Sequence, residues 1–346
     1  MTIIDPDIRK AETLPSRYYT DLGTFNSIIS SFGENWHFAG HRSQLSAAQP
    51  IDNSLREPML LTQLDGEIHC ISNVCTHRGM LVCTEESDGK RLQCPYHGRI
   101  FSLDGRFRSM PEFGQVENFP TSADDLRKFP LSEWKGLLFN TISASDFESF
   151  ISAVEDRVGW LPIADFTPDL SRHREYTIDS NWALYVDNYL EGFHIPFVHG
   201  DLHEVLDYDA YSTELFDGGV LQIGIANEGE PSFDLPEGHP DYGQNIAAYY
   251  FWLYPGLMLN FYPWGLSVNL VIPEAADKTR IVYHGFVGDA SMLGQGAGGD
   301  LDKVEAEDQF IVEGCQKGVS SVAYERGRYS PTKEAGVHHF HRILTQ

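Results

Sequence analysis

Two cysteine–histidine pairs carry the clearest chemistry in this sequence. One residue separates Cys75 from His77, two residues separate Cys94 from His97, and sixteen residues lie between the pairs. Two thiolates and two imidazoles can bind zinc or an iron–sulfur centre. A Cys2His2 zinc site usually groups cysteine with cysteine and histidine with histidine, whereas each loop here offers one of each. The mixed arrangement favours a diiron cluster in which one iron takes both thiolates and the other takes both imidazoles.

A second group of possible metal ligands lies on one stripe of an expected helix. The sequence predicts a helix over residues 182–195, in which Asp187, Glu191 and His194 occupy positions i, i+4 and i+7. Residues with this spacing share one face of a helix. We therefore expect two carboxylates and one imidazole to point in the same direction.

Another histidine follows this stripe after a proline. His199 comes five residues after His194, which would place it on a different side of an unbroken helix. Pro196 lies between them and predicts that the helix ends or kinks near Ile195. The turn that follows could bring His199 back beside His194, so that two imidazoles become available to one metal ion.

A late helix adds a carboxylate. We expect a helix over residues 301–325 with Asp308 on its buried face. A buried, unpaired carboxylate is costly, so Asp308 should be protonated, paired with a buried arginine or histidine, or neutralised by a cation. Two neutral imidazoles and one carboxylate are the ligand set of non-haem Fe(II) enzymes that activate oxygen, and His194, His199 and Asp308 fit it. The apolar positions that define the expected buried face are Leu301, Val304, Ile311, Cys315, Val319 and Val322.

The cysteine–histidine pairs resemble the Rieske [2Fe–2S] domain, whose motif joins Cys-X-His to Cys-X2-His. Respiratory-chain Rieske proteins carry an extra cysteine in each loop, and these cysteines form a disulfide. The loops over residues 75–80 and 94–98 have no such pair. The resemblance is therefore to the disulfide-free kind found in ferredoxins and oxygenases, and we expect Cys70, Cys83 and Cys315 to be buried thiols.

The second group is similar to the catalytic domain of Rieske non-haem iron oxygenase α subunits. The motif D-N-X2-E-X2-H-X4-H covers residues 187–199 and lies more than eighty residues after the first. In that family, the carboxylate three residues before the first histidine ligand connects the cluster of one subunit to the iron of its neighbour. The resemblance implies an electron path from His97 through Glu191 to His194, with Asp187 as the alternative bridge.

The resemblance also implies an activity, cofactors and partners. We expect an O2-dependent oxidoreductase with one Rieske [2Fe–2S] cluster and one mononuclear Fe(II) per chain, assembled as a head-to-tail homotrimer. It would hydroxylate or oxidatively demethylate a small substrate, with electrons from NAD(P)H delivered by a separate reductase, with or without a ferredoxin. The sequence shows no G-X-G-X2-G dinucleotide fingerprint after a strand, in agreement with this external supply.

The expected substrate is a quaternary or tertiary amine. Glu191 stands where the family usually has aspartate. In having glutamate at this position, the sequence is similar to the carnitine- and choline-type monooxygenases. A net charge of −25 would attract a cation, and it disfavours nucleic acid and anionic membranes as partners. An aromatic-ring-hydroxylating dioxygenase, and a Rieske electron-transfer protein without catalysis, are the alternatives.

An uncharged aromatic tract over residues 249–264 is expected to line part of the substrate pocket. Aromatic faces attract quaternary ammonium groups, although the same tract could simply form the core face of a sheet. The residues expected at the pocket are Tyr249, Phe251, Trp252, Phe261 and Trp264.

The elements that must position these residues fall into two packing units, and the fold class is α+β. Short alternating segments separated by Asp-Gly pairs at residues 65, 88 and 104 predict antiparallel hairpins in an all-β Rieske domain. The second unit is expected to be a helix-grip (START/Bet v1-like) catalytic domain with an antiparallel sheet. The expected boundaries are an N-terminal arm over 1–36 that packs on the catalytic domain, the Rieske domain over 37–145 and the catalytic domain over 146–346.

The sequence also argues against a membrane protein. Residues 246–273 lack charge over a length that could span a bilayer. Pro255-Gly256 and Pro263 interrupt this stretch, so we predict buried strands joined by a turn. The N-terminus shows no secretory signal, and the five cysteines are an odd number. We therefore expect a cytoplasmic protein.

Overall fold

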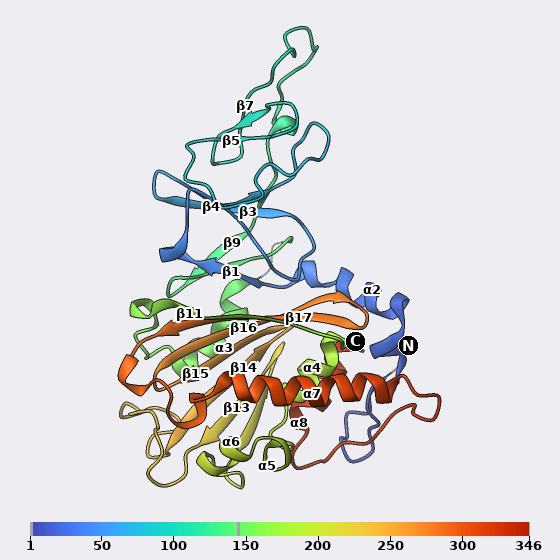
Figure 1. Cartoon of the computed structure of the whole chain (residues 1–346), viewed down its shortest axis with the longest axis vertical. Coiled ribbons are helices and arrows are strands. Elements are labelled where there is room, and N and C mark those ends of the chain that lie inside the picture. The colour runs from blue at the N-terminus through green and yellow to red at the C-terminus, as the bar shows by residue number, and fades with distance from the viewer. Residues whose placement is uncertain (1–2, 144–145, 346) are drawn as a thin grey trace. The chain divides into compact units, whose positions relative to one another are not determined.

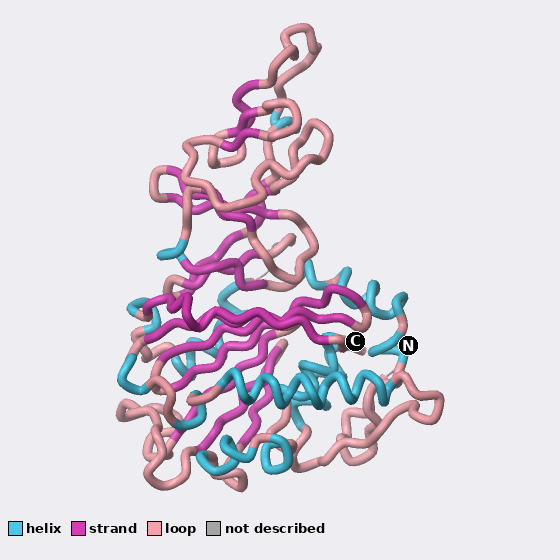
Figure 2. The backbone as a smooth tube through the Cα atoms, in the orientation of Figure 1, coloured by secondary structure: helices cyan, strands magenta, loops and turns pink. Residues whose placement is uncertain are grey.

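The computed structural model describes residues 3–143 and 146–345 and forms two compact units (Figure 1). One unit contains Phe32–Phe147, and the other joins the N-terminal segment up to Ser31 to the chain from Glu148 onward. Short strands and long loops dominate the first unit, whereas the second combines long strands with helices (Figure 2). The boundary expected between residues 145 and 146 adjoins residues 144 and 145, which lie outside the described residues.

The smaller unit is built from three antiparallel sheets, as expected for an all-β domain. The three-stranded sheet has the order β1 (His37–His41), β10 (Leu137–Asn140), β9 (Leu131–Trp134). The four-stranded sheet has the order β2 (Ala48–Pro50), β3 (Met59–Leu64), β4 (Glu67–Ser72), β8 (Lys128–Phe129). The third sheet has the order β5 (Leu92–Gln93), β6 (Ile100–Phe101), β7 (Phe107–Ser109).

Two of the three predicted Asp-Gly turns join neighbouring strands. Asp65 and Gly66 connect β3 to β4 with φ angles of 51° and 86°, the positive pair that a two-residue type I′ hairpin requires. Gly105, with φ of 85°, lies in the turn between β6 and β7. The hairpin predicted at Asp88-Gly89 is wrong, because the Gly89 N–H donates to the Ser87 side chain within a loop that precedes β5.

The two loops that carry the cysteine–histidine pairs have the same backbone turn. Gly79 and Gly98 both adopt φ of 72°. The Gly79 N–H donates to the Cys75 carbonyl at 2.9 Å, and the Gly98 N–H donates to the Cys94 carbonyl at 3.1 Å. Each loop therefore closes on its cysteine through a glycine in the left-handed region, which other residues enter at a cost.

The larger unit contains a seven-stranded antiparallel sheet with the order β11-β17-β16-β15-β14-β13-β12. Residues 246–273 supply three of its central strands, so the prediction of buried strands is confirmed. Among the described residues, no helix is long and apolar enough to cross a membrane. The strands are β11 (Thr167–Ile178), β12 (Ser212–Phe216), β13 (Gly219–Ile225), β14 (Ile246–Leu253), β15 (Leu257–Tyr262), β16 (Gly265–Ala275) and β17 (Lys278–Val287).

Helices complete this unit, and the longest of them, α7, runs across one face of the sheet (Figure 1). A helix held against a curved antiparallel sheet is the expected α+β architecture. The helices are α1 (Arg17–Thr20), α2 (Leu22–Ser30), α3 (Phe147–Val158), α4 (Trp182–Tyr189), α5 (Ile195–Val198), α6 (Gly200–Val205), α7 (Leu301–Val319) and α8 (Ala335–Leu344).

The face that helix α7 turns inward matches the predicted face only in part: Leu301, Val304 and Asp308 line an inner cavity, and Val319 is buried, as expected. Its buried residues are Glu305, Val312, Gln316 and Val319, whereas Cys315 is exposed. The prediction followed apolar residues only, but polar side chains occupy this buried face because they find polar partners. The Gln316 amide, for example, accepts from the Asn181 N–H at 2.8 Å.

Helix α4 is shorter than predicted. It begins after Asn181, whose side chain accepts the Ala183 N–H at 2.9 Å, and it ends at Tyr189. The Tyr189 carbonyl accepts a hydrogen bond from the Gln222 side chain on β13, which takes the place of a further helical turn. Pro196 does not end this helix and lies instead in the first turn of α5, where its missing N–H is not needed.

Replacing Gly98 with alanine should weaken the second loop of the smaller unit. A side chain in the left-handed region costs about 1 kcal/mol, so the loop should hold its ligands less firmly. The Gly98→Ala protein should therefore retain less iron and acid-labile sulfide after purification, measured per chain. Gly114→Ala is the matched control, because Gly114 has no positive φ and no atom within 4 Å of an added Cβ. Equal iron and sulfide contents in the two variants would contradict the prediction.

Candidate metal centre

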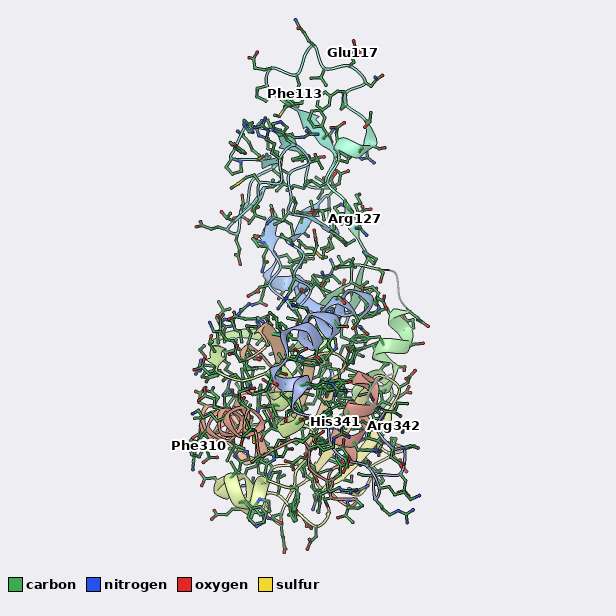
Figure 3. All side chains as sticks on the ribbon, turned by 90° about the vertical axis from the view of Figure 1, so that its right-hand side faces the viewer. Phe113, Glu117, Arg127, Phe310, His341 and Arg342 are labelled. Carbon is green, nitrogen blue, oxygen red and sulfur yellow. The ribbon has the colours of Figure 1, made fainter. Side chains whose placement is uncertain are left out.

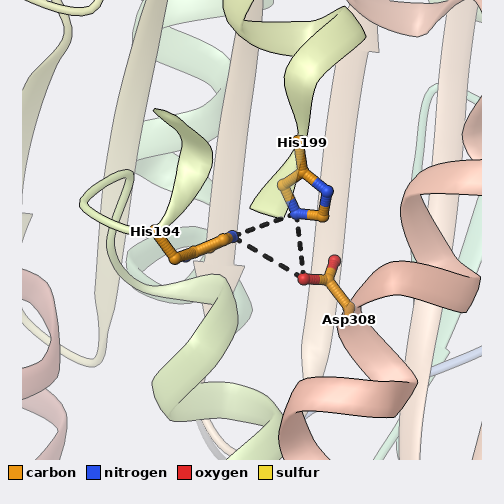
Figure 4. Close-up of side chains that lie close together, drawn as sticks. All are labelled: His194, His199 and Asp308. Atoms are coloured by element: carbon orange, nitrogen blue, oxygen red, sulfur yellow. Dashed lines mark hydrogen bonds and ion pairs between the residues drawn. The ribbon is translucent and has the colours of Figure 1, made fainter. Parts of the chain in front are cut away.

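His194, His199 and Asp308 converge on one point in the larger unit (Figure 4). The two Nε2 atoms lie 3.1 Å apart, and Asp308 Oδ1 lies 3.0 Å from His199 Nε2 and 3.6 Å from His194 Nε2. His194 comes from the segment after α4, His199 from the end of α5, and Asp308 from α7. The structure thus brings together the three residues that the sequence analysis selected as a ligand set.

The other ring nitrogen of each histidine is bound to a carboxylate. His194 Nδ1 donates to Glu191 Oε1 at 2.8 Å, and His199 Nδ1 donates to Glu307 Oε2 at 2.7 Å. The backbone N–H of His194 also donates to Glu191, at 3.0 Å. A proton on Nδ1 leaves the Nε2 lone pair free, so both imidazoles present an acceptor to the shared point.

Sequence reasoning did not give Glu307 a role. Its position directly before Asp308 could have indicated a supporting role. Two adjacent residues of a helix point in different directions, so Glu307 could not bind the same metal ion as Asp308. In the structure, Glu307 supports His199 from outside while Asp308 reaches the shared point.

The surroundings of the shared point attract positive charge. His199 is 2% exposed, and although its burial disfavours the charged ring, its contacts with Asp308 and Glu307 raise its pKa above the ordinary value. The Asp308 carboxylate accepts one further hydrogen bond, from Asn188 at 2.7 Å. Among the described residues, no lysine or arginine forms an ion pair with it. Two imidazole nitrogens and a carboxylate oxygen without a basic partner fit a divalent iron ion.

The smaller unit places its four candidate ligands in two matching pairs. The buried thiols of Cys75 and Cys94 contact each other, and burial raises the pKa of Cys75. The rings of His77 and His97 lie edge to face with centroids 4.8 Å apart, and both are partly exposed. Two adjoining thiols and two adjoining imidazoles are the ligand types of a [2Fe–2S] cluster with one iron on each pair.

Asp187 does not reach the metal centre. Its carboxylate accepts hydrogen bonds from the Tyr19 hydroxyl at 2.8 Å and from His341 Nε2 at 2.7 Å. The Tyr329 hydroxyl contacts the other nitrogen of His341 at 2.6 Å. The stripe predicted for Asp187 and Glu191 is therefore wrong, because α4 ends at Tyr189 and the chain changes direction before Glu191.

A cavity of about 110 Å³ lies beside the three converging residues. Its walls include Gln222, Asn260 and Glu305, together with a set of tyrosines. The tyrosines are Tyr185, Tyr189, Tyr211, Tyr250, Tyr262 and Tyr283.

The aromatic residues predicted at the pocket do not line this cavity. Successive residues of a strand point to opposite faces of a sheet, and Tyr250 and Tyr262 face the cavity. Tyr249, Phe251 and Phe261 belong to the opposite face, as their cross-strand pairing shows. The prediction identified the correct strands but the wrong set of alternating residues.

The two predicted tryptophans have other partners. Trp252 packs against Phe340 of α8, with ring centroids 5.1 Å apart. Trp264 lines a different cavity, where the Arg172 guanidinium lies 4.9 Å from its ring centroid. Both side chains are buried, Trp252 in β14 and Trp264 in the turn between β15 and β16.

Comparison with known proteins covers both units. Residues 35–120 match the Rieske [2Fe–2S] domain, and residues 165–346 match the catalytic domain of the ring-hydroxylating α subunit. The chain is 29% identical to the chloroplastic choline monooxygenase of Arabidopsis thaliana over 99% of this chain and 85% of that protein. It is also 29% identical to the carnitine monooxygenase oxygenase subunit of Escherichia coli K12, over 98% of this chain and 94% of that protein.

A solved structure has the same fold over nearly the whole chain. It is a quaternary ammonium Rieske monooxygenase, described in connection with carnitine oxidation by gut microbiota and inter-subunit electron transfer. The TM-score is 0.79 at 23% identity, over 99% of this chain and 96% of that one. Because the catalytic-domain match covers more than half of the 346 residues and a Rieske domain precedes it, the chain belongs to the Rieske oxygenase α subunits.

Proposed function

We propose that this chain is the oxygenase component of a Rieske-type monooxygenase that hydroxylates or oxidatively demethylates a small quaternary or tertiary amine. The observation that carries the proposal is the position of the tyrosine-lined cavity directly beside the convergence point of His194, His199 and Asp308. Aromatic faces bind quaternary ammonium groups through cation–π attraction, worth about 0.5–2 kcal/mol each. The similarity to choline and carnitine monooxygenases supports the same class of substrate.

In this proposal, each chain holds one cluster and one mononuclear iron. Cys75 and Cys94 bind one cluster iron, and His77 and His97 bind the other. His194, His199 and Asp308 bind the mononuclear Fe(II) and leave positions open toward the cavity. When bound, the two centres supply stored single electrons and activation of O2, while the chain supplies ligand geometry and a partly enclosed substrate site.

Glu191 is proposed to connect the cluster of one subunit to the iron site of the next. Its hydrogen bond to His194 Nδ1 supports this role. Glu191 Oε2 accepts the His194 backbone N–H, and a carboxylate oxygen has a further lone pair with which to accept from a partner subunit's histidine. In this chain, His97 is partly exposed and its ring stacks on Tyr96, whose side chain is 56% exposed. The partly exposed ring of His97 in the smaller unit is therefore accessible to a partner subunit.

A head-to-tail homotrimer is proposed as the assembly that brings these two surfaces together. Phe197 and Phe310 are 81% and 78% exposed, and Figure 3 shows Phe310 on the outer side of α7. Both residues line a surface groove that also includes Glu307, which supports His199. Exposed apolar side chains beside Glu307 are suited to contact with another subunit.

A separate reductase, with or without a ferredoxin, is the proposed electron donor. The cytoplasmic location stays a prediction.

Metal analysis separates this proposal from a Rieske electron-transfer protein. The anaerobically reconstituted protein should contain about three iron atoms and about two sulfides per chain. The Asp308→Ala variant should contain about two iron atoms and keep the cluster's visible absorption, because it loses one ligand of the mononuclear site. Two iron atoms in the unmodified protein, with no further loss in the variant, would favour the electron-transfer protein.

Replacing Glu191 with glutamine should uncouple the two centres. Glutamine keeps the size of the side chain but loses the charge, so substrate turnover should fall about 10- to 100-fold while iron and sulfide contents stay unchanged. The measurement is the rate at which O2 oxidises the pre-reduced cluster in the presence of substrate. Asp187→Asn is the comparison variant and should keep cluster oxidation, because Asp187 binds Tyr19 and His341 instead of His194. The Glu191 bridge would be contradicted if Glu191→Gln also kept it.

Substrate class can be tested by O2 uptake with a generic reductase. Choline or L-carnitine should stimulate uptake and yield an oxidised or demethylated product, because the tyrosine faces favour cations over neutral rings. The Asp308→Ala variant controls for uptake by the reductase alone. Stimulation by monocyclic aromatic compounds but not by quaternary amines would favour the aromatic-ring-hydroxylating alternative.

A further inference from the structure

A buried carboxylate in the cavity wall takes no part in binding iron. Glu305 lies on α7 one turn before Asp308, is 3% exposed and borders the cavity beside the metal centre. Neither its own contacts nor those of His194 and His199 join it to the ligand set. The ligand assignments therefore leave Glu305 without a role.

The partners of Glu305 are neutral. Its Oε2 accepts from the Tyr185 hydroxyl at 2.6 Å and from the Tyr283 hydroxyl. Its Oε1 accepts from the Gln309 side chain at 3.0 Å. Among the described residues, no lysine, arginine or histidine forms an ion pair with it. Hydrogen bonds satisfy the oxygens but do not cancel the charge, which remains unfavourable in a buried site until a cation approaches.

The balance of these effects keeps the carboxyl group able to ionise near neutral pH. Burial raises the pKa of Glu305 to about 7, the hydrogen bonds from Tyr185 and Tyr283 oppose this rise, and the nearby Asp308 adds to it. Burial and the Glu305 charge raise the pKa values of Tyr185 and Tyr283 well above 10, so both phenols stay protonated as donors. A cation beside Glu305 would further favour its ionised form.

The cavity itself has no positive side chain to compete for this charge. Its described walls contain tyrosines, amides, aliphatic residues and the metal-centre residues, and neither lysine nor arginine is among them. Tyr185 and Tyr283 border the cavity and also hold Glu305, so the aromatic faces and the carboxylate belong to one wall. Such a wall combines the two interactions that recognise a quaternary ammonium group, which cannot itself donate a hydrogen bond.

We propose that Glu305 is the counter-ion of the substrate's quaternary ammonium group and thereby makes this site select cationic over neutral substrates. This inference rests on the proposed function, because it assigns a charge partner within the same cavity. Tyr185 and Tyr283 act with Glu305 by fixing its carboxylate in the wall, where the methyl groups of the cation meet the aromatic faces.

Two probes of nearly the same shape can isolate the charge. Choline carries a trimethylammonium group, whereas 3,3-dimethylbutan-1-ol carries a neutral tert-butyl group in its place. Binding of both is measured by calorimetry on the iron-loaded protein without reductase, so that the readout does not depend on turnover. The wild-type protein should bind choline about tenfold or more tightly than the neutral alcohol.

The Glu305→Gln variant should lose this preference. Its affinity for choline should fall about tenfold or more, while its affinity for 3,3-dimethylbutan-1-ol should stay unchanged. Glu305→Asp, which keeps the charge, should still prefer choline. Glu313→Gln is the matched control, because it removes one negative charge from the same helix outside the cavity and should bind both probes as the wild type does.

Other outcomes would contradict either the counter-ion role of Glu305 alone or also the quaternary-amine substrate class. If Glu305→Gln keeps the wild-type preference, or loses affinity for both probes equally, Glu305 is not the counter-ion, and the proposed function is unaffected. If the wild-type protein binds choline no better than the alcohol, both the counter-ion and the quaternary-amine substrate class are wrong.

Discussion

The structure of the larger unit depends on two imidazoles that each bind a carboxylate with Nδ1 and direct Nε2 toward a common point. This arrangement needs Glu191 and Glu307 outside the ring pair and Asp308 on the inside. One short segment after α4 and one face of α7 must therefore meet within hydrogen-bonding distance. The early end of α4, where Gln222 binds the Tyr189 carbonyl, frees that segment to turn toward α7.

The sequence predicted what depends on residue type and spacing. The Cys-X-His and Cys-X2-His loops, the two histidines near Pro196 and the carboxylate at Asp308 could each be recognised from their chemistry. The structure brings His194, His199 and Asp308 together and places the His77 and His97 rings in contact. The α+β architecture followed equally well from hairpin turns and helical periodicity. These features are local, so a single sequence contains them.

The errors concern which face an element turns inward. Phe251 and Tyr250 are adjacent in one strand, and only the pairing with neighbouring strands decides which of them meets the cavity. On α7, the buried face carries Glu305 and Gln316 because the Tyr185 hydroxyl donates a hydrogen bond to Glu305 and the Asn181 N–H donates one to Gln316. Apolar periodicity cannot reveal partners that come from more than a hundred residues away. The same limit hid the contacts of Asp187, which was expected on the stripe of Glu191 and lies beside Tyr19 and His341 instead.

The separation of the site residues along the chain has a consequence for the order of synthesis. Asp308 follows His199 by 109 residues. His341, which binds Asp187, follows Asp187 by 154 residues. During synthesis, His194 and His199 therefore emerge from the ribosome well before Asp308, the carboxylate that meets them in the folded chain. The smaller unit, with its four ligands within residues 75–97, is fully synthesised much earlier. The candidate cluster ligands are thus all present on a nascent chain, whereas the three residues of the candidate mononuclear site meet only after α7 has folded onto the sheet.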